Sequence, residues 1–227
     1  ESMVFNGPVS VSGSGSSLAV TEVNGATLAF NGGGGQPGVT VGGGATMTVG
    51  NTSVTNPMSF NGVTLGSGAG TALTLSTAAA ASPSFNGTTE LGADALLQFT
   101  MAAGTNWNNS FSPSFGAVNL AGGARISISQ QAANSAKTFN GAITVTGAGA
   151  EISSTGTWQY GSGEAMNVNA PVRVLGSGSG LTVNVRNAAT FSGSADDNAL
   201  SVDAGASFAG ATTGGTYSFT RPVSVGA

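Results

Sequence analysis

The stretch Phe5-Asn6-Gly7-Pro8-Val9-Ser10-Val11 contains the pattern that the rest of the chain repeats: an aromatic residue, Asn and Gly, then an alternating apolar segment. The triplet Phe-Asn-Gly returns at Phe30, Phe60, Phe85 and Phe139, and degenerate copies start at Phe115, Met166, Phe191 and Phe219. Successive starts are 24 to 30 residues apart. This recurrence predicts a repeat architecture in which each unit packs only on its neighbours.

Each repeat contains two or three short segments in which apolar and polar residues alternate, such as Val39-Thr40-Val41 and Leu73-Thr74-Leu75. Period-two alternation bounded by Gly, Ser and Asn predicts β-strands, and no segment has the 3.6-residue period of a helix. We therefore predict an all-β, single-domain parallel β-solenoid of about eight coils over residues 1–227. Its coils are expected to start near residues 5, 30, 60, 85, 115, 139, 166, 191 and 219. A β-sandwich or barrel is the alternative, but it would not explain why Phe recurs at one phase.

A solenoid stacks the inward residues of each coil on those of the next coil, about 4.8 Å away. We expect the first residue of every repeat, Met166 included, to form one inward ladder. The Asn that follows is expected to form a second ladder at a corner, where its amide bonds to the next coil and its backbone can be left-handed. Gly in third place is expected to supply a tight turn.

The composition of the chain excludes some classes of binding partner. Charged residues are 6% of the chain and the net charge is −4, whereas typical soluble proteins contain about 25% charged residues. The five basic residues all follow residue 120, so we expect no nucleic-acid partner, since phosphate binding needs a concentrated basic surface. No apolar run is long enough for a spanning helix, and we expect no membrane insertion.

The chain has no His and no Cys, which removes the common nucleophile–base pairs and thiolate-ligated metals. Carboxylates that could serve a carbohydrate-active solenoid enzyme are Glu90 with Asp94, and Asp196 with Asp197 and Asp203. Neither group has an aromatic platform in its own turn. We therefore expect solvated loop charges, no catalytic residue and no cofactor.

The candidate metal site is the run Asp196, Asp197 and Asn198, whose oxygens could bind Ca²⁺. The run lacks the Gly-Gly-x-Gly-x-Asp repeat of calcium-binding β-rolls, and the same residues suit a plain turn. An ice-binding face is a further alternative, since Thr recurs at outward positions. Gln, Asn and Arg interrupt that row, which argues against a flat lattice-matched surface.

Trp107, Trp158 and Tyr160 lie outside the ladder, in long polar loops. Exposed aromatic residues in polar loops are typical of glycan platforms and of protein interfaces. We expect these three either to fold over the side of the solenoid as lids or to make a lateral contact, with a glycan or matrix as candidate partner.

The phrases Gly25-Ala26-Thr27-Leu28-Ala29-Phe30 and Gly44-Ala45-Thr46-Met47-Thr48-Val49, with Gly-Ser turns and Phe-Asn-Gly corners, resemble the strand repeats of bacterial autotransporter passenger domains and related β-solenoid adhesins. The resemblance covers essentially the whole chain and rests on low-complexity repeats. It implies a secreted or surface-displayed rod used in adhesion or in an extracellular layer, with no catalytic residues to carry over. It leaves open a cleaved passenger, a fragment or a free secreted subunit.

The last repeat, Phe219-Thr220-Arg221-Pro222-Val223-Ser224-Val225, matches the first almost letter for letter. Open solenoid coils expose unpaired strand edges that recruit other chains. We therefore expect the C-terminal face of one subunit to continue into the N-terminal face of the next, a heterologous contact that propagates as a filament. The expected interface residues are Glu1, Phe5, Val9, Val11, Phe219, Arg221, Val223 and Val225, with Glu1 or Glu22 facing Arg221.

These observations favour an extracellular structural protein that assembles with itself head to tail into a β-solenoid fibre or surface layer. Two other functions stay open from the sequence. One is a monomeric surface adhesin that binds a glycan or matrix, and the other is a carbohydrate-active β-helix enzyme.

Overall fold

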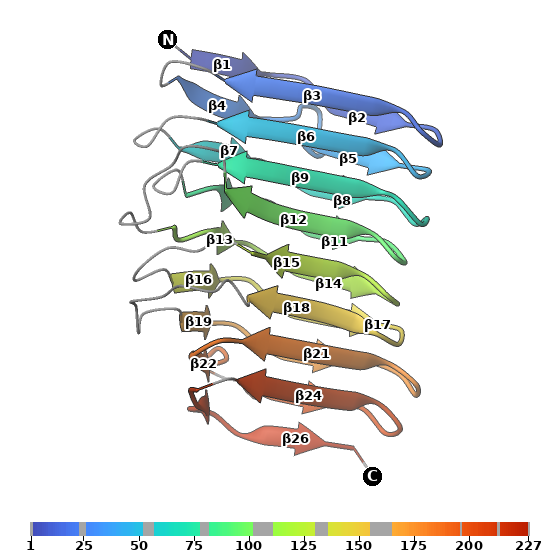
Figure 1. Ribbon diagram of the computed structural model, residues 1–227. Coiled ribbons are helices and arrows are strands. Elements are labelled where there is room, and N and C mark those ends of the chain that lie inside the picture. The colour runs from blue at the N-terminus through green and yellow to red at the C-terminus, as the bar shows by residue number, and fades with distance from the viewer. Residues whose placement is uncertain are drawn as a thin grey trace.

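The computed structural model describes residues 2–22, 26–51, 57–77, 82–101, 111–129, 136–154, 165–195, 197–212 and 214–226. Within these ranges the chain forms 26 β-strands and no helix. The strands belong to three parallel sheets that run along a common axis from the N-terminal to the C-terminal coil (Figure 1). Each turn of the chain adds one strand to each sheet, so the predicted parallel β-solenoid is confirmed.

We call the sheets first, second and third, in the order in which each coil enters them. The first sheet contains β1 (Ser2–Phe5), β4 (Thr27–Phe30), β7 (Met58–Phe60), β10 (Ser84–Phe85), β13 (Ser114–Phe115), β16 (Ala136–Phe139), β19 (Ala165–Val168), β22 (Ala188–Phe191) and β25 (Tyr217–Phe219). The second contains β2 (Val9–Ser12), β5 (Val39–Gly42), β8 (Val63–Leu65), β11 (Thr89–Leu91), β14 (Val118–Ala121), β17 (Ile143–Thr146), β20 (Val172–Val174), β23 (Leu200–Val202) and β26 (Val223–Val225). The third contains β3 (Ser17–Glu22), β6 (Thr46–Asn51), β9 (Ala72–Thr77), β12 (Leu96–Met101), β15 (Arg125–Ile128), β18 (Ala150–Ser154), β21 (Gly180–Val185) and β24 (Ser207–Thr212).

The sheets differ in strand number. Over the described residues the first and second sheets have nine strands each and the third has eight. Eight sets of three strands are thus complete, which makes seven coil-to-coil steps in the third sheet, and β25 and β26 begin a further coil. The predicted number of about eight coils is correct to within one, and the third sheet ends one strand before the other two.

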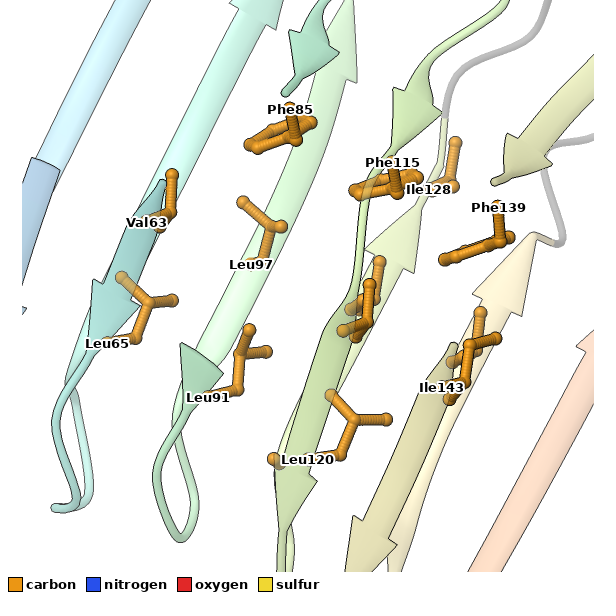
Figure 2. Close-up of a cluster of buried hydrophobic side chains, with 14 of the residues drawn as sticks. Val63, Leu65, Phe85, Leu91, Leu97, Phe115, Leu120, Ile128, Phe139 and Ile143 are labelled. Carbon is orange, nitrogen blue, oxygen red and sulfur yellow. The ribbon is translucent and has the colours of Figure 1, made fainter. Parts of the chain in front are cut away.

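The core lies between the three sheets and is built from alternate residues of every strand. In β8, Val63 and Leu65 point inward and are fully buried, whereas Thr64 between them faces outward. Figure 2 shows how such side chains from successive coils lie in rows, with Leu65, Leu91 and Leu120 as one example. Strict register follows from this alternation, because a slip of one residue would turn every apolar side chain to the surface.

The predicted aromatic ladder is present. Rings from Phe5 to Phe139 stack in one row along the first sheet, with centroids 4.6 to 5.0 Å apart and planes within 11° of parallel. Figure 2 shows Phe85, Phe115 and Phe139 as consecutive members. The row resumes between Phe191 and Phe219, whose centroids are 4.9 Å apart.

One ladder assignment was wrong. Val168, not Met166, pairs with Phe139 on one side and Phe191 on the other, so this coil begins two residues later than predicted. Met166 pairs instead with Lys137 and Ala189. Both Met166 and Val168 point inward because they are two residues apart in a strand, so alternation alone could not distinguish them.

Corner asparagines link successive coils, as predicted. Asn31 Nδ2 donates to Asn6 Oδ1 at 3.0 Å, Asn61 Nδ2 donates to the Asn31 carbonyl at 3.0 Å, and Asn169 Nδ2 donates to Asn140 Oδ1 at 3.0 Å. The left-handed backbone that Asn could tolerate at such a corner is not used by these residues. Asp94 is the one non-glycine residue with positive φ among those that the structure describes, so the amide ladder does not need a left-handed residue.

In several coils the Gly in third place does not form the expected tight turn with a left-handed backbone. Gly32 and Gly62 do have positive φ, but Gly87 and Gly141 do not. A Cβ on Gly87 would lie 2.6 Å from the Gly62 nitrogen, and one on Gly141 would clash with the Ala117 nitrogen. At these corners glycine is required because the backbones of adjacent coils approach too closely for a side chain.

Candidate functional site

The carboxylates considered for catalysis do not gather into one site. Glu90 lies in β11 and faces outward from the second sheet, where its Oε1 accepts a hydrogen bond of 2.7 Å from Asn119 Nδ2. Asp94 lies in the turn before β12 and lines a different hollow, together with Arg125. The structure therefore places the two on separate surfaces. No group of three or more His, Cys, Asp or Glu that could hold a metal occurs among the described residues.

The structure describes two of the three residues in the candidate calcium-binding run. Asp196 lies outside the described residues. The carboxylate of Asp197 contacts Arg173 Nη2 at 3.4 Å and accepts a 2.8 Å hydrogen bond from Ser194 Oγ. Asn198 Nδ2 lies 3.5 Å from Ser201 Oγ. Asp197 thus already has a cationic neighbour.

Asp203, the remaining acidic candidate, serves the backbone of the preceding coil. Its Oδ2 accepts a 2.9 Å hydrogen bond from the Gly176 N–H. Asp197 and Asp203 therefore have different partners in the structure, and their contacts are those of turn and corner residues.

Trp107, Trp158 and Tyr160 lie outside the described residues, and the predicted lateral contact stays a prediction. The three belong to the segments between β12 and β13 and between β18 and β19, which connect the third sheet to the first. Glu1 also lies outside the described residues.

Inward, core-forming positions are exposed at the two end faces of the rod. Val223 and Val225 of β26 are 47% and 70% exposed, whereas Val63 and Leu65, at the same positions in β8, are 0% and 1% exposed. On the N-terminal face Met3 and Leu18 are 39% and 36% exposed, although their register partners Leu28 and Met47 are buried. Each end face therefore presents apolar side chains that an adjoining coil would cover.

The predicted interface residues occupy these faces as follows. Phe5 and Phe219 are the two ends of the aromatic row and are half-buried, as is Val9. Val11 is buried at 8% exposed. Met3 and Leu18 were missed from the sequence. Period-two alternation would have found Met3, because it lies two residues before Phe5 in the same strand.

The electrostatic part of the predicted joint needs correction. Glu22, named as a partner for Arg221, is 2% exposed, and its Oε1 accepts a 2.7 Å hydrogen bond from the Ala26 N–H. It is unavailable on the surface because the last inward position of β3 turns it into the core. Arg221 is exposed, and its Nη1 donates to the Ala195 carbonyl at 3.1 Å. Glu1 lies outside the described residues, so its expected contact with Arg221 stays a prediction.

Tyr217 covers part of the core on the C-terminal face. It lies in β25 of the first sheet, and its hydroxyl reaches the carbonyl oxygens of Val183 in β21 and Ala211 in β24, on the third sheet. Burial raises the pKa of the Tyr217 hydroxyl above its ordinary value. Among the described residues the third sheet has no strand at the level of β25 and β26. The Tyr217 side chain crosses the interior at this level.

Comparisons with protein-family models, with curated proteins and with solved structures find no match. In the part of the chain that the structure describes, no helix has the length and apolar character needed to cross a membrane.

Proposed function

We propose that the chain is an extracellular structural subunit whose rods stack head to tail into a β-solenoid fibre or surface layer. The observation that carries the proposal is that both end faces expose inward ladder residues in the same register. Phe5 and Phe219 end one aromatic row, and Val9 and Val223 occupy equivalent positions of the second sheet.

The repeat register predicts the contacts of the joint. Within the rod Phe5 pairs with Phe30, Val9 with Val39 and Val11 with Val41. In the joint we expect Phe219, Val223 and Val225 of one copy to stack on Phe5, Val9 and Val11 of the next. Edge pairing of this kind supplies main-chain hydrogen bonds, and burial of the apolar side chains supplies affinity.

Two of the three sheets would be continuous through such a joint. The edge of β25 would pair with β1, and the edge of β26 would pair with β2. Because the third sheet ends at β24, one strand position would separate β24 from β3 of the next copy. Tyr217 lies over this side of the core, and Leu18 of the next copy would face it.

The contact is heterologous, since one face meets a different face, and its repetition gives an open filament rather than a closed ring if the axes align. The low charge of the chain and its resemblance to passenger repeats support an extracellular location. The resemblance also supports a role as a rod rather than as an enzyme.

Electron microscopy of the purified chain over a range of concentrations tests the proposal. We expect rods that lengthen with concentration in multiples of one subunit, with a diffraction repeat of about 4.8 Å along the axis. Rods that keep the length of one subunit at every concentration would contradict it.

A further inference from the structure

The outer face of the second sheet is hollowed where β8, β11 and β14 lie side by side. One hollow of about 490 Å³ and another of about 300 Å³ share the lining residues Thr64 and Glu90, so they form a continuous groove. Ligand pockets commonly have volumes of about 300–1,000 Å³. We call this surface the side groove; its principal polar side chains are Gln36, Asn61, Thr64, Thr88, Glu90 and Asn119.

The groove results from a difference in loop length between adjacent coils and from glycine residues at the corners. Eight residues, 31–38, connect β4 to β5, whereas two residues, 61–62, connect β7 to β8 in the next coil. The longer loop turns back on itself through a 3.0 Å hydrogen bond from the Gln36 N–H to the Gly33 carbonyl, and it forms one wall. The corners that follow contain Gly62 and Gly87, which have no side chain, and both glycines line the hollow beside that wall.

The lining offers hydrogen-bond donors and acceptors beside apolar surface. Asn and Gln amides both donate and accept, and Thr hydroxyls do the same. Glu90 is held in place by the 2.7 Å hydrogen bond from Asn119 Nδ2 to its Oε1, and a carboxylate has room for further donors on its two oxygens. A ligand with many hydroxyl groups, each able to donate and accept, matches this set.

Charge and spacing restrict the ligand further. Among the described residues that line the two hollows, Glu90 is charged and none is Lys or Arg, so an anionic ligand would meet repulsion. Thr64, Glu90 and Asn119 are register partners in adjacent strands. The stacked rings of the same coils are 5.0 and 4.8 Å apart, so these polar side chains recur at that spacing along the axis.

We infer that the side groove binds a neutral polysaccharide that runs along the rod axis across β8, β11 and β14. Glu90 accepts hydrogen bonds from sugar hydroxyls, and Asn61, Thr64 and Asn119 both donate and accept. The lining residues of this site come from strands of the second sheet and from the corners on either side of those strands. The site lies on the side of the rod, so its occupation does not require the head-to-tail joint.

A matched pair of carboxylates allows a sharp test. Glu151 Oε1 accepts a 2.8 Å hydrogen bond from Asn184 Nδ2 on the third sheet, just as Glu90 accepts one from Asn119 on the second. Thr64 and Thr74 are likewise outward residues of one coil, on the second and third sheets. We therefore compare Glu90→Gln with Glu151→Gln, and Thr64→Tyr with Thr74→Tyr.

The probes are cellohexaose, laminarihexaose, mannohexaose and xylohexaose, with hexagalacturonate as the anionic comparison, and binding is measured by calorimetry. We expect at least one neutral hexasaccharide to bind and hexagalacturonate to bind more weakly. Glu90→Gln should weaken binding about fivefold, because hydrogen bonds to a charged acceptor are roughly twice as strong as neutral ones. Thr64→Tyr should abolish binding by filling the groove, and both third-sheet variants should bind like the parent protein.

Three results would overturn the inference. The first is no binding of any neutral hexasaccharide at concentrations up to about 10 mM. The second is equal loss in the second-sheet and third-sheet variants. The third is loss of binding in a Trp107→Ala, Trp158→Ala double variant while Thr64→Tyr still binds. Circular dichroism checks that each variant is folded, and rod length by microscopy should be unchanged by Glu90→Gln.

Discussion

Replacing Phe60 with alanine is expected to lower the free energy of unfolding by about 5 kcal/mol, the upper part of the range for a buried Phe→Ala change. Phe60 is fully buried and stacks on Phe30 and Phe85, with both centroid distances 5.0 Å. The substitution leaves a cavity between two rings and removes two aromatic pairs, each worth about 0.5–1.5 kcal/mol beyond its buried area.

The matched control is Phe5→Ala at the end of the same row. Phe5 is half-buried and stacks on one ring, that of Phe30, at 4.8 Å. We expect the loss there to be about half as large, because one ring contact and less buried area are removed. Urea unfolding at a dilution where the chain is monomeric gives both values. Hydrogen exchange of β7 and β10 amides checks local opening, since repeat arrays need not unfold in one step. Equal losses of unfolding free energy in Phe60→Ala and Phe5→Ala would contradict a continuous core ladder.

Replacing Val223 with lysine is expected to abolish stacking and to raise the dissociation constant of the joint by at least about 100-fold. Val223 is 47% exposed at an inward position, and burial of a Val side chain contributes about 1.5–3 kcal/mol. An unpaired ammonium group in its place must also lose water, which adds to the cost. Since about 1.4 kcal/mol is a factor of ten in affinity, the burial term alone accounts for much of the expected change.

Sedimentation velocity measures the effect, and Leu175→Lys is the control. Leu175 is 36% exposed in the corner between β20 and β21, away from both end faces, so its replacement should leave assembly unchanged. A Val223→Lys chain keeps an unaltered N-terminal face. Added in small amounts to the parent chain, it should therefore join growing fibres and shorten them. Fibres of normal length in that mixture would contradict the predicted polarity of the joint.

Most of the fold could be predicted because the Phe-Asn-Gly motif recurs at the same position of successive repeats. Phe at the same point of successive repeats specified the inward row, and period-two alternation specified which side of each strand is buried. The prediction failed at the degenerate repeat because Phe is replaced there, and Met166-Asn167-Val168 resembles Phe-Asn-Gly through its Asn. The phrase Val168-Asn169-Ala170-Pro171-Val172 matches Phe5-Asn6-Gly7-Pro8-Val9 through its Asn, Pro and Val. Aligning on these residues would have placed the coil correctly.

Burial of charged residues was harder to predict than burial of apolar ones. Glu22 and Lys137 are 2% and 1% exposed, although charged side chains are rarely buried. Lys137 lies two residues before Phe139 in β16, so alternation does put it on the inward side. Of the two expected partners of Arg221, Glu22 is therefore excluded by its burial, whereas Glu1 lies outside the described residues.

The end faces could be anticipated, whereas the side groove could not. The match between the first and last phrases of the chain indicated that Phe5 and Phe219 share a register. The groove depends on the difference between an eight-residue and a two-residue corner in adjacent coils and on which outward residues become neighbours. Residues 26 positions apart, such as Thr64 and Glu90, come together only after the register is known.

Disulfide formation between engineered cysteines tests the head-to-tail joint most directly. In the proposed joint Ser224 of β26 lies opposite Ser10 of β2 in the next copy, as Ser10 lies opposite Thr40 within the rod. Both serines are exposed, and the native chain has no Cys. Adjacent strands are about 4.8 Å apart, within the Cα separations of about 4.4–6.8 Å that a disulfide spans.

The measurement mixes a Ser10→Cys chain with a Ser224→Cys chain under mild oxidation and follows covalent dimers by non-reducing gel electrophoresis. Stacking of C-terminal on N-terminal faces predicts dimers in the mixture and few in either chain alone. A Ser10→Cys, Ser224→Cys double variant should form covalent multimers. Absence of dimers in the mixture, or equal dimer formation by each chain alone, would contradict the head-to-tail joint.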